Sequence, residues 1–266
     1  TGVNSAYNFI DLDGADQYIV SSANSGISGS NPFSISAWIN PDIDPPDTGN
    51  DYMLFTKTGS TSANQMACGA ILRVSGVNYL GYLNHTNDLY SNHVVPNNTW
   101  SHVLITYSSG TYESGLKIYL NGVVHSSLTA KYAEFGSTTN ATPNIASTVF
   151  EIGKQQDSNS SYWNGQIGQV AIWNKDISSD VGSIYNAGRH TNLLDSYSDN
   201  LLGYWAMSAL DASTGLSDSL STIYDRSGNS HHGTPTNADA SDLASSPNAE
   251  PNGYSKGETN RSNNTP

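Results

Sequence analysis

The sequence predicts an all-β fold built from antiparallel strands, and two observations carry that prediction. Apolar and polar residues alternate with a period of two along short stretches such as Leu116–Leu120, which is the pattern of a half-buried strand. Asn121-Gly122 follows directly and supplies the two residues with positive φ that a tight type I′ turn needs, so Val123 turns back against the preceding strand. Residues 97–128 are therefore expected to form three consecutive antiparallel strands.

The same alternation places other strands along the chain, separated by turn residues. A strand, a turn at 13–16 and a second strand are expected within Tyr7–Ser22. Further strands are expected at Phe33–Asn40, Tyr52–Lys57, Ala70–Val74, Tyr79–Leu83, Val149–Gly153 and Trp163–Trp173, and strand signals continue to about Trp205. One short helix is predicted at Ile177–Ala187, where apolar residues have helical spacing, Ser178 or Ser179 can cap the start, and Gly188 follows the end.

Length and composition indicate one domain with an acidic surface. The chain has 266 residues, and all-β sandwiches of roughly 200 to 250 residues are routinely single domains. Its 10 Lys and Arg against 23 Asp and Glu give a net charge of −13, which argues against binding to nucleic acid or to anionic membranes. Cys68 is the single cysteine, so no disulfide forms within the chain. No apolar run approaches the roughly 18 residues of a spanning helix, and no secretory leader is present, so membrane insertion is not expected.

The central strands also carry a family motif. N-x-W-x-H-x-x-x-T-Y, formed here by Asn98, Trp100, His102, Thr106 and Tyr107, precedes G-L-K-I-Y-L-N-G at residues 115–122. This pattern resembles the laminin-G-like domains of the concanavalin A-like lectin/glucanase superfamily. The resemblance implies a two-sheet antiparallel jelly-roll sandwich. We expect Trp38, Val103, Ile105, Ile118, Leu120, Ile172 and Trp205 in its core.

The order of the C-terminal motifs suggests a setting for the protein. D-x-S-G-N, at residues 225–229, follows the jelly roll here, whereas it opens the fold in many relatives. This order resembles modules in virion and tail proteins of marine bacteriophages, and it implies a location on a virion or another extracellular assembly. We expect the jelly roll to span residues 1–238 and residues 239–266 to form a polar tail that reaches another subunit of a homo-oligomer. The expected partners are copies of the chain, other virion or surface proteins, and host glycans.

Two classes of function follow from the resemblance. The first is a non-enzymatic structural or adhesive module, and the second is a polysaccharide-active enzyme such as a glucanase or lyase. Glucanases of this superfamily place carboxylates in an E-x-D-x-x-E motif, since retaining cleavage needs two carboxyl groups about 5 Å apart. That motif is absent from the sequence, which favours the module. His231-His232 are expected to be solvated turn residues, because adjacent histidines of an extended chain point to opposite sides.

A calcium ion is predicted at the first turn. Jelly rolls of this superfamily often hold one Ca²⁺, and Asp11, Asp13 and Asp16 offer hard oxygen ligands there. The alternative is that Asp13 and Asp16 stabilise the turn itself. The position where the family carries an acidic residue reads Ile167-Gly168-Gln169-Val170, so a ligand from that strand would be a backbone carbonyl.

Glycan binding is predicted at loops near one end of the sandwich. Aromatic rings stack on sugar faces, while Asp and Asn side chains hydrogen-bond hydroxyl groups. The candidate residues are Tyr90, Tyr112, Asp157, Asn159, Tyr162 and Trp163. The alternative is that Trp163 packs at the start of a strand and the tyrosines decorate the surface.

Overall fold

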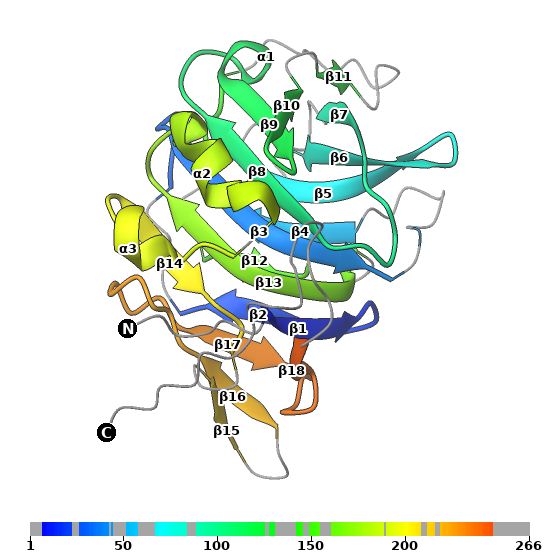
Figure 1. Ribbon diagram of the computed structural model, residues 1–266, viewed down its shortest axis with the longest axis vertical. Coiled ribbons are helices and arrows are strands. Elements are labelled where there is room, and N and C mark those ends of the chain that lie inside the picture. Colours follow the sequence, from blue (N-terminus) through cyan, green and yellow to red (C-terminus); the bar gives the residue numbers. More distant parts are fainter. Residues whose placement is uncertain are drawn as a thin grey trace.

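The computed structural model confirms an all-β sandwich of two antiparallel sheets (Figure 1). It describes residues 7–22, 27–42, 44, 52–57, 67–83, 89–125, 128–130, 142–145, 149–154, 161–188, 190–208, 212–215 and 219–246. None of the helices in these segments is long and apolar enough to cross a membrane.

The first sheet, called sheet A here, has eight strands. Seven run in the order β10-β9-β8-β3-β13-β1-β18, and β14 also pairs with β13. Their bounds are β1 (Tyr7–Asp13), β3 (Phe33–Pro41), β8 (Ser101–Tyr107), β9 (Leu116–Leu120), β10 (Val123–His125), β13 (Asn164–Trp173), β14 (Leu201–Trp205) and β18 (Leu243–Ser246). β1 and β14 share one edge of β13, because β1 pairs with residues 164–167 and β14 with residues 170–173. The register of β13 against β3 shifts between Gly168 and Ala171, where Gln169 has a φ of 47°.

The second sheet, called sheet B here, has ten strands in the order β11-β7-β6-β5-β4-β12-β2-β17-β16-β15. Their bounds are β2 (Tyr18–Ser21), β4 (Tyr52–Lys57), β5 (Ala67–Val74), β6 (Val77–Leu83), β7 (Leu89–Val94), β11 (Thr129–Ala130), β12 (Glu151–Ile152), β15 (Ala212–Thr214), β16 (Leu220–Ile223) and β17 (Gly233–Thr236). The first two strands of the chain therefore lie in different sheets, although only the turn at residues 14–17 separates them.

The main core lies between the sheets. Sheet A contributes buried residues such as Ile35, Val103 and Ile118, and sheet B contributes Ile19, Leu80 and other apolar residues to the same cluster. Of the expected core residues, Val103, Ile105, Ile118, Ile172 and Trp205 are buried in this cluster, and Leu120 packs against it while half-buried. Trp38 is buried as well, but it packs with Phe9 and Trp100 in a separate cluster outside the sandwich.

Short helices cover the outer face of sheet A. They are the 3-10 turn Ser178–Asp180, α2 (Val181–Tyr185), the 3-10 turn Asn186–Gly188 and α3 (Leu193–Ser196). A further short helix, α1 (Tyr112–Gly115), joins β8 to β9 and places Tyr112 in the core between the sheets. The helix predicted at 177–187 is thus present but broken into short turns, and Asn186 at φ 49° ends its α-helical part. Neither serine caps the start; the N-cap position is Ile177, and the preceding Asp176 accepts the Ser178 N–H on its Oδ1 at 2.9 Å. Figure 1 shows α2 lying across β8 and β3.

The boundary expected between the domain and its tail is wrong. β18 (Leu243–Ser246) pairs with Tyr7–Ile10 of β1, so the sheet continues eight residues past position 238. Asp242 also accepts a hydrogen bond from Gln17 at 3.0 Å and accepts the Asp239 N–H at 2.8 Å, which fixes the turn that leads into β18. Residues 247–266 of the predicted tail lie outside the described part of the chain.

Candidate functional site

Two of the predicted glycan-binding aromatics are core residues. Tyr112 and Trp163 are both 0% exposed, so their rings present no face to a sugar and the expectation that they lie on the surface is wrong. α1 turns Tyr112 inward, where its ring contacts Tyr82 and Tyr107 at centroid distances of 5.4 and 6.3 Å. Trp163 packs at the start of β13, as the alternative reading proposed. Asp157 and Asn159 lie outside the described residues.

Tyr90 and Tyr162 do not form one site. Tyr90 is half-buried on β7 and packs with Tyr79, at a centroid distance of 5.1 Å, and with the small apolar cluster of Leu72 and Leu83. Tyr162 bridges to Lys154, which directly follows β12 and Gly153. β7 and β12 are separated by four strand spacings in sheet B, which corresponds to about 19 Å.

Tyr162 instead belongs to a group that we call the tyrosine–lysine cluster, formed by Tyr18, Lys154 and Tyr162. The Lys154 Nζ lies 4.3 Å from the centroid of the Tyr18 ring and 5.7 Å from that of Tyr162. The two rings are 6.2 Å apart and tilted by 50°. Tyr18 is half-buried, whereas Lys154 and Tyr162 are each 9% exposed. The ammonium therefore lies against two aromatic faces, an arrangement that a cation–π interaction stabilises.

Local backbone features place the three side chains together. Ile19 points into the core from β2, so its neighbour Tyr18 points to the outer face of sheet B. Gly153 has a φ of 84°, and a Cβ there would collide with Leu12, so glycine is required where the chain leaves β12. The Trp163 N–H donates to the Gly153 carbonyl at 2.8 Å. This bond and the backbone bridge between Lys154 and Tyr162 set those two residues opposite each other.

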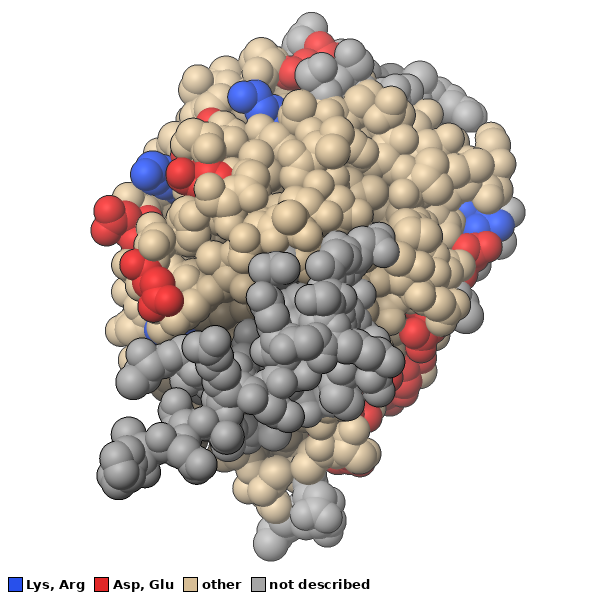
Figure 2. Space-filling view, in the orientation of Figure 1, with Lys and Arg blue, Asp and Glu red and all other residues tan. Residues whose placement is uncertain are grey.

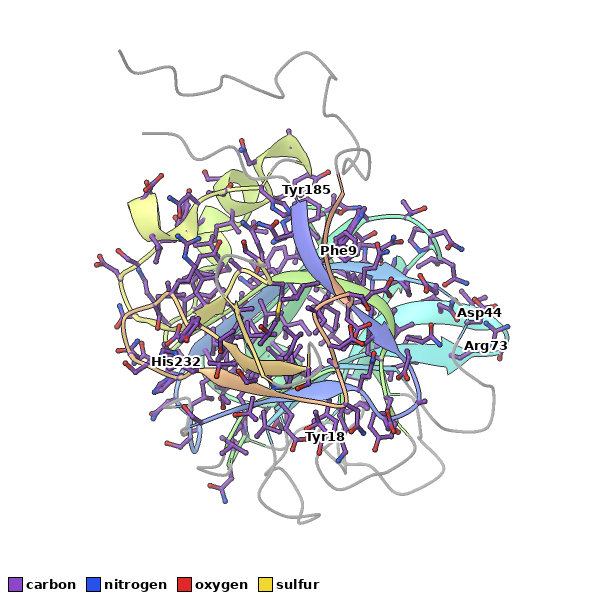
Figure 3. The ribbon with its side chains drawn as sticks, turned by 90° about the horizontal axis from the view of Figure 1, so that it is seen from below. Phe9, Tyr18, Asp44, Arg73, Tyr185 and His232 are labelled. Atoms are coloured by element: carbon purple, nitrogen blue, oxygen red, sulfur yellow. The ribbon has the colours of Figure 1, made fainter. Side chains whose placement is uncertain are left out.

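The outer face of sheet B around this cluster lies on the opposite side of the molecule from the helices. Figure 3 shows Tyr18 on one side of the sandwich, and Phe9 and Tyr185 on the other. Figure 2 shows a largely uncharged surface on the helix side, with Asp and Glu gathered toward its left and lower right edges.

The aspartates predicted to bind calcium stabilise the first turn. The Asp13 carboxylate accepts the N–H groups of Ala15 at 2.8 Å and Asp16 at 3.3 Å, which is an Asx-type turn. Asp11 is half-buried in β1 and accepts a hydrogen bond from Gln166 at 3.4 Å. Burial raises the pKa of the Asp11 carboxyl, the hydrogen bond from Gln166 opposes this, and the negative charge of Asp42 raises it further.

These aspartates do not gather into a ligand set among the described residues. No group of three or more His, Cys, Asp or Glu side chains is arranged there to hold a metal. The register also places Asn164, not Gly168, opposite Asp13. Calcium binding at this turn stays a prediction.

The D-x-S-G-N segment forms a structural support. The buried Asp225 carboxylate accepts backbone N–H groups from Tyr204, Ser227 and His231 at 2.8 to 3.0 Å, and the Ser227 hydroxyl at 2.8 Å. His232 accepts the Asp225 N–H on its Nδ1 at 3.2 Å. The segment therefore holds β14 beside the turn before β17, and His232 is engaged in that turn.

A buried serine–histidine pair has the wrong surroundings for catalysis. The Ser36 hydroxyl and His102 Nε2 are 2.8 Å apart, but both residues lie on the helix-covered face of sheet A and are at most 2% exposed. His102 Nδ1 has no hydrogen-bond partner among the described residues, so no carboxylate orients the ring there. Burial lowers the pKa of His102 to about 3, which fits a neutral side chain in the core.

A polar network that the sequence analysis missed closes one end of the sandwich. The Asp44 carboxylate pairs with the Arg73 guanidinium at 2.6 Å and accepts the side-chain amides of Asn78 at 2.7 Å and Asn97 at 2.5 Å. These hydrogen bonds hold the pKa of Asp44 below its usual range. Figure 3 shows Asp44 and Arg73 together at this end. Arg73 lies on β5 and Asn78 on β6, whereas Asp44 and Asn97 lie in two separate loops, so sequence spacing gives no signal for the network.

Solved structures with a similar fold include proteins of several kinds. A proposed carbohydrate-binding protein from Bacteroides ovatus ATCC 8483 matches with a TM-score of 0.61 and 17% identity. That match covers 90% of this chain and 59% of the Bacteroides protein, so the chain spans about three fifths of its length.

Two other structures match less well. The heptameric SAP-like pentraxin of Limulus polyphemus has a TM-score of 0.48 at 15% identity, with coverage of 69% of this chain and 84% of the pentraxin. The enzymatically active domain of tailspike protein 2 from bacteriophage CBA120 has a TM-score of 0.49 at 13% identity, with coverage of 71% and 28%. At these levels they add nothing to the assignment of the fold or the function.

A search of the curated proteins finds no significant match. The family model described as the concanavalin A-like lectin/glucanases superfamily matches residues 13–180, which is more than half of the chain. This match confirms the resemblance that the central strand motif indicated. Together with the two-sheet architecture, it shows that the chain belongs to the concanavalin A-like lectin/glucanases superfamily.

Proposed function

We propose that the protein is a non-enzymatic glycan-binding module carried by a virion or another extracellular assembly. The observation that carries the proposal is the tyrosine–lysine cluster on the outer face of sheet B. Aromatic faces stack on the C–H groups of sugar rings, and an ammonium donates hydrogen bonds to sugar oxygens. The Bacteroides ovatus protein, itself proposed to bind carbohydrate, supports the proposal at the level of the fold.

The absence of the glucanase motif from the sequence supports the non-enzymatic part. Of the glutamates whose side chains are described, Glu113 is exposed on α1 and Glu151 is buried in β12, so these two come from separate elements. The Ser36–His102 pair is covered by Tyr185 and Trp38, whose rings lie 6.0 and 5.1 Å from His102, so a polymeric substrate has no path to it.

A binding screen tests the proposal. The protein would be titrated with neutral and acidic oligosaccharides, and Tyr18→Ala would be compared with Tyr224→Ala. Tyr224 is 41% exposed and packs beside His232, outside the cluster, so it is a matched surface tyrosine. We expect the wild-type protein to bind at least one saccharide, Tyr18→Ala to lose that binding, and Tyr224→Ala to keep it. Equal binding by both variants would contradict the proposed site.

A measurement of polysaccharide cleavage distinguishes the second candidate, a polysaccharide-active enzyme, from the non-enzymatic module. Incubation with β-glucans and uronate polymers would be followed by measurement of new reducing ends and unsaturated products. We expect none. Turnover that survives removal of contaminating activity, and that a point variant abolishes, would replace the module with the enzyme.

Assembly into a homo-oligomer is also part of the proposal, since virion appendages repeat one chain. A truncation that tests the tail predicted at 239–266 must keep residues 243–246, because their removal would delete β18 from sheet A. Truncation after Ser246 keeps that strand. We expect light scattering to show an oligomer for the full chain and a smaller species for the truncated chain. A monomeric full chain would contradict the proposal.

A further inference from the structure

Lys154 is a largely buried cation without an anionic partner among the described residues. It is 9% exposed, and its ammonium makes no hydrogen bond or ion pair with any described residue. Its stabilising contacts are the two tyrosine rings, at 4.3 and 5.7 Å.

This situation is unusual on physical grounds. A lysine side chain that is largely buried is normally paired with a carboxylate, because removing water from an ammonium is costly, whereas a cation–π contact contributes only roughly 0.5 to 2 kcal/mol. The chain holds 23 acidic residues and 10 basic ones, so carboxylates are not scarce. Arg73 shows the ordinary outcome, since Asp44 pairs with it at 2.6 Å.

The environment of Lys154 also has a defined shape. The rings of Tyr18 and Tyr162 have centroids 6.2 Å apart, and the ammonium lies over the two neighbouring rings, closer to Tyr18. The backbone bridge between Lys154 and Tyr162 fixes both residues relative to each other. A ligand that reaches Lys154 therefore meets a positive charge and aromatic surface together.

We propose that Lys154 is the anion-recognition centre for acidic saccharides, in which a carboxylate or sulfate of the ligand pairs with Nζ while a sugar ring lies against Tyr18. The inference rests on the proposed function and narrows it to a ligand class. Charge-assisted hydrogen bonds between an ammonium and an oxyanion are roughly twice as strong as neutral ones, so the acidic group supplies the selectivity. The acidic character of the rest of the chain then limits nonspecific attraction of polyanions.

The test compares saccharides that differ in charge. Isothermal titration would use oligogalacturonate, a sulfated oligosaccharide and neutral malto-oligosaccharide of the same length. The variants are Lys154→Met, which keeps an apolar chain beside the rings, Lys154→Arg, which keeps the charge, and Lys117→Gln. Lys117 is an exposed lysine of β9 in sheet A, so this control removes one charge far from the site. Thermal unfolding of each variant would establish that it is folded.

We expect the wild-type protein to bind at least one acidic saccharide at least about tenfold more tightly than the neutral one, which is the order of one charged hydrogen bond. Lys154→Met should bind acidic and neutral saccharides with about equal affinity, while Lys154→Arg and Lys117→Gln should keep the preference for the acidic one. Comparison of the affinities for oligogalacturonate and for the sulfated oligosaccharide identifies which oxyanion is recognised.

Other results would overturn the inference in distinguishable ways. Equal binding of neutral and acidic saccharides by the wild-type protein, or an unchanged preference in folded Lys154→Met, would reject Lys154 as the centre and leave the glycan-binding function in place. A wild-type protein that binds no saccharide of either kind would reject both. If Lys154→Met does not fold, a folded Lys154→Gln is measured in its place. Loss of the acidic preference in that variant supports the site, and retention rejects it.

Discussion

The two outer faces of the sandwich differ in how they are used. On sheet A, Trp173, Leu104 and Ala171 are buried beneath Ile177, Ile184 and Leu193 of the helical segments, so this face acts as a second core. On sheet B, the outer face next to β2 and β12 carries the tyrosine–lysine cluster, and Tyr18 remains half-buried there. In the proposed account, sheet A supplies stability and sheet B supplies the saccharide-binding surface.

The largest expected effect is on the covered face. Trp173→Ala should lower the free energy of unfolding by about 3 to 5 kcal/mol, because it leaves a large cavity beneath the helices. It also leaves the Tyr197 carbonyl without the indole N–H that donates to it at 2.7 Å. Urea unfolding measures the change, and Tyr224→Ala on the exposed surface is the control. A loss below about 1 kcal/mol would show that this face is not a second core.

The turn between β1 and β2 joins the two faces, and calcium there would sharpen the comparison. If Ca²⁺ binds through Asp11, Asp13 and Asp16, it ties sheet A to sheet B. A hundredfold excess of the ion over its dissociation constant then stabilises the fold by about 2.7 kcal/mol. Melting with EDTA and with added Ca²⁺ measures the effect. An unchanged midpoint in both conditions, and in Asp13→Ala, would leave the aspartates as turn residues alone.

Acid should weaken the covered face specifically. The pKa of His102 falls to about 3 in the folded protein because of burial, whereas the unfolded chain titrates near 6.5. Below pH 6.5 the unfolded state therefore binds a proton that the folded state does not, and stability falls as the pH drops from 6.5 toward 3. At pH 5 the loss from His102 is about 2 kcal/mol. Burial and the neighbouring His102 also lower the pKa of His190, to about 3, so His190 adds to the loss in the same direction.

The measurement is urea unfolding between pH 4 and 7 for the wild-type protein and for His102→Gln. Glutamine can still hydrogen-bond to Ser36, but it does not titrate. We expect a shallower decline of stability with acid in the variant. Identical slopes in the two proteins would show that His102 does not control the acid response.

The sequence predicted the parts of the fold that local chemistry determines. Asn121-Gly122 specifies the β9–β10 hairpin by itself, and both residues have the positive φ expected, 50° and 79°. β18 was missed because Leu243–Ser246 is short and weakly apolar, and its pairing with β1 depends on a partner more than 230 residues away. The assignment of β1 and β2 to different sheets likewise depends on long-range pairing, which alternation along a strand does not report.

The candidate site was predicted less well than the fold. Alternation with Ile19 indicates that Tyr18 points away from the core, but the approach of Lys154 depends on the β2–β12 register and on the turn at Gly153. Tyr112 was misplaced because residue type alone does not tell a surface tyrosine from one that a short helix turns inward. The sequence thus supplied one of the three residues of the cluster, Tyr162.

The most direct test of the central claim compares one tyrosine from each outer face. On the covered face, the ring of Tyr185 stacks on that of Trp38 with centroids 6.1 Å apart. On the other face, the Lys154 ammonium lies over the ring of Tyr18. Saccharide titration and urea unfolding would be carried out on Tyr185→Ala and Tyr18→Ala. We predict that Tyr18→Ala loses saccharide binding with at most about 1 kcal/mol of destabilisation, while Tyr185→Ala binds normally and loses more stability. The opposite pattern, with binding lost only in a folded Tyr185→Ala, would contradict the assignment of stability to sheet A and binding to sheet B.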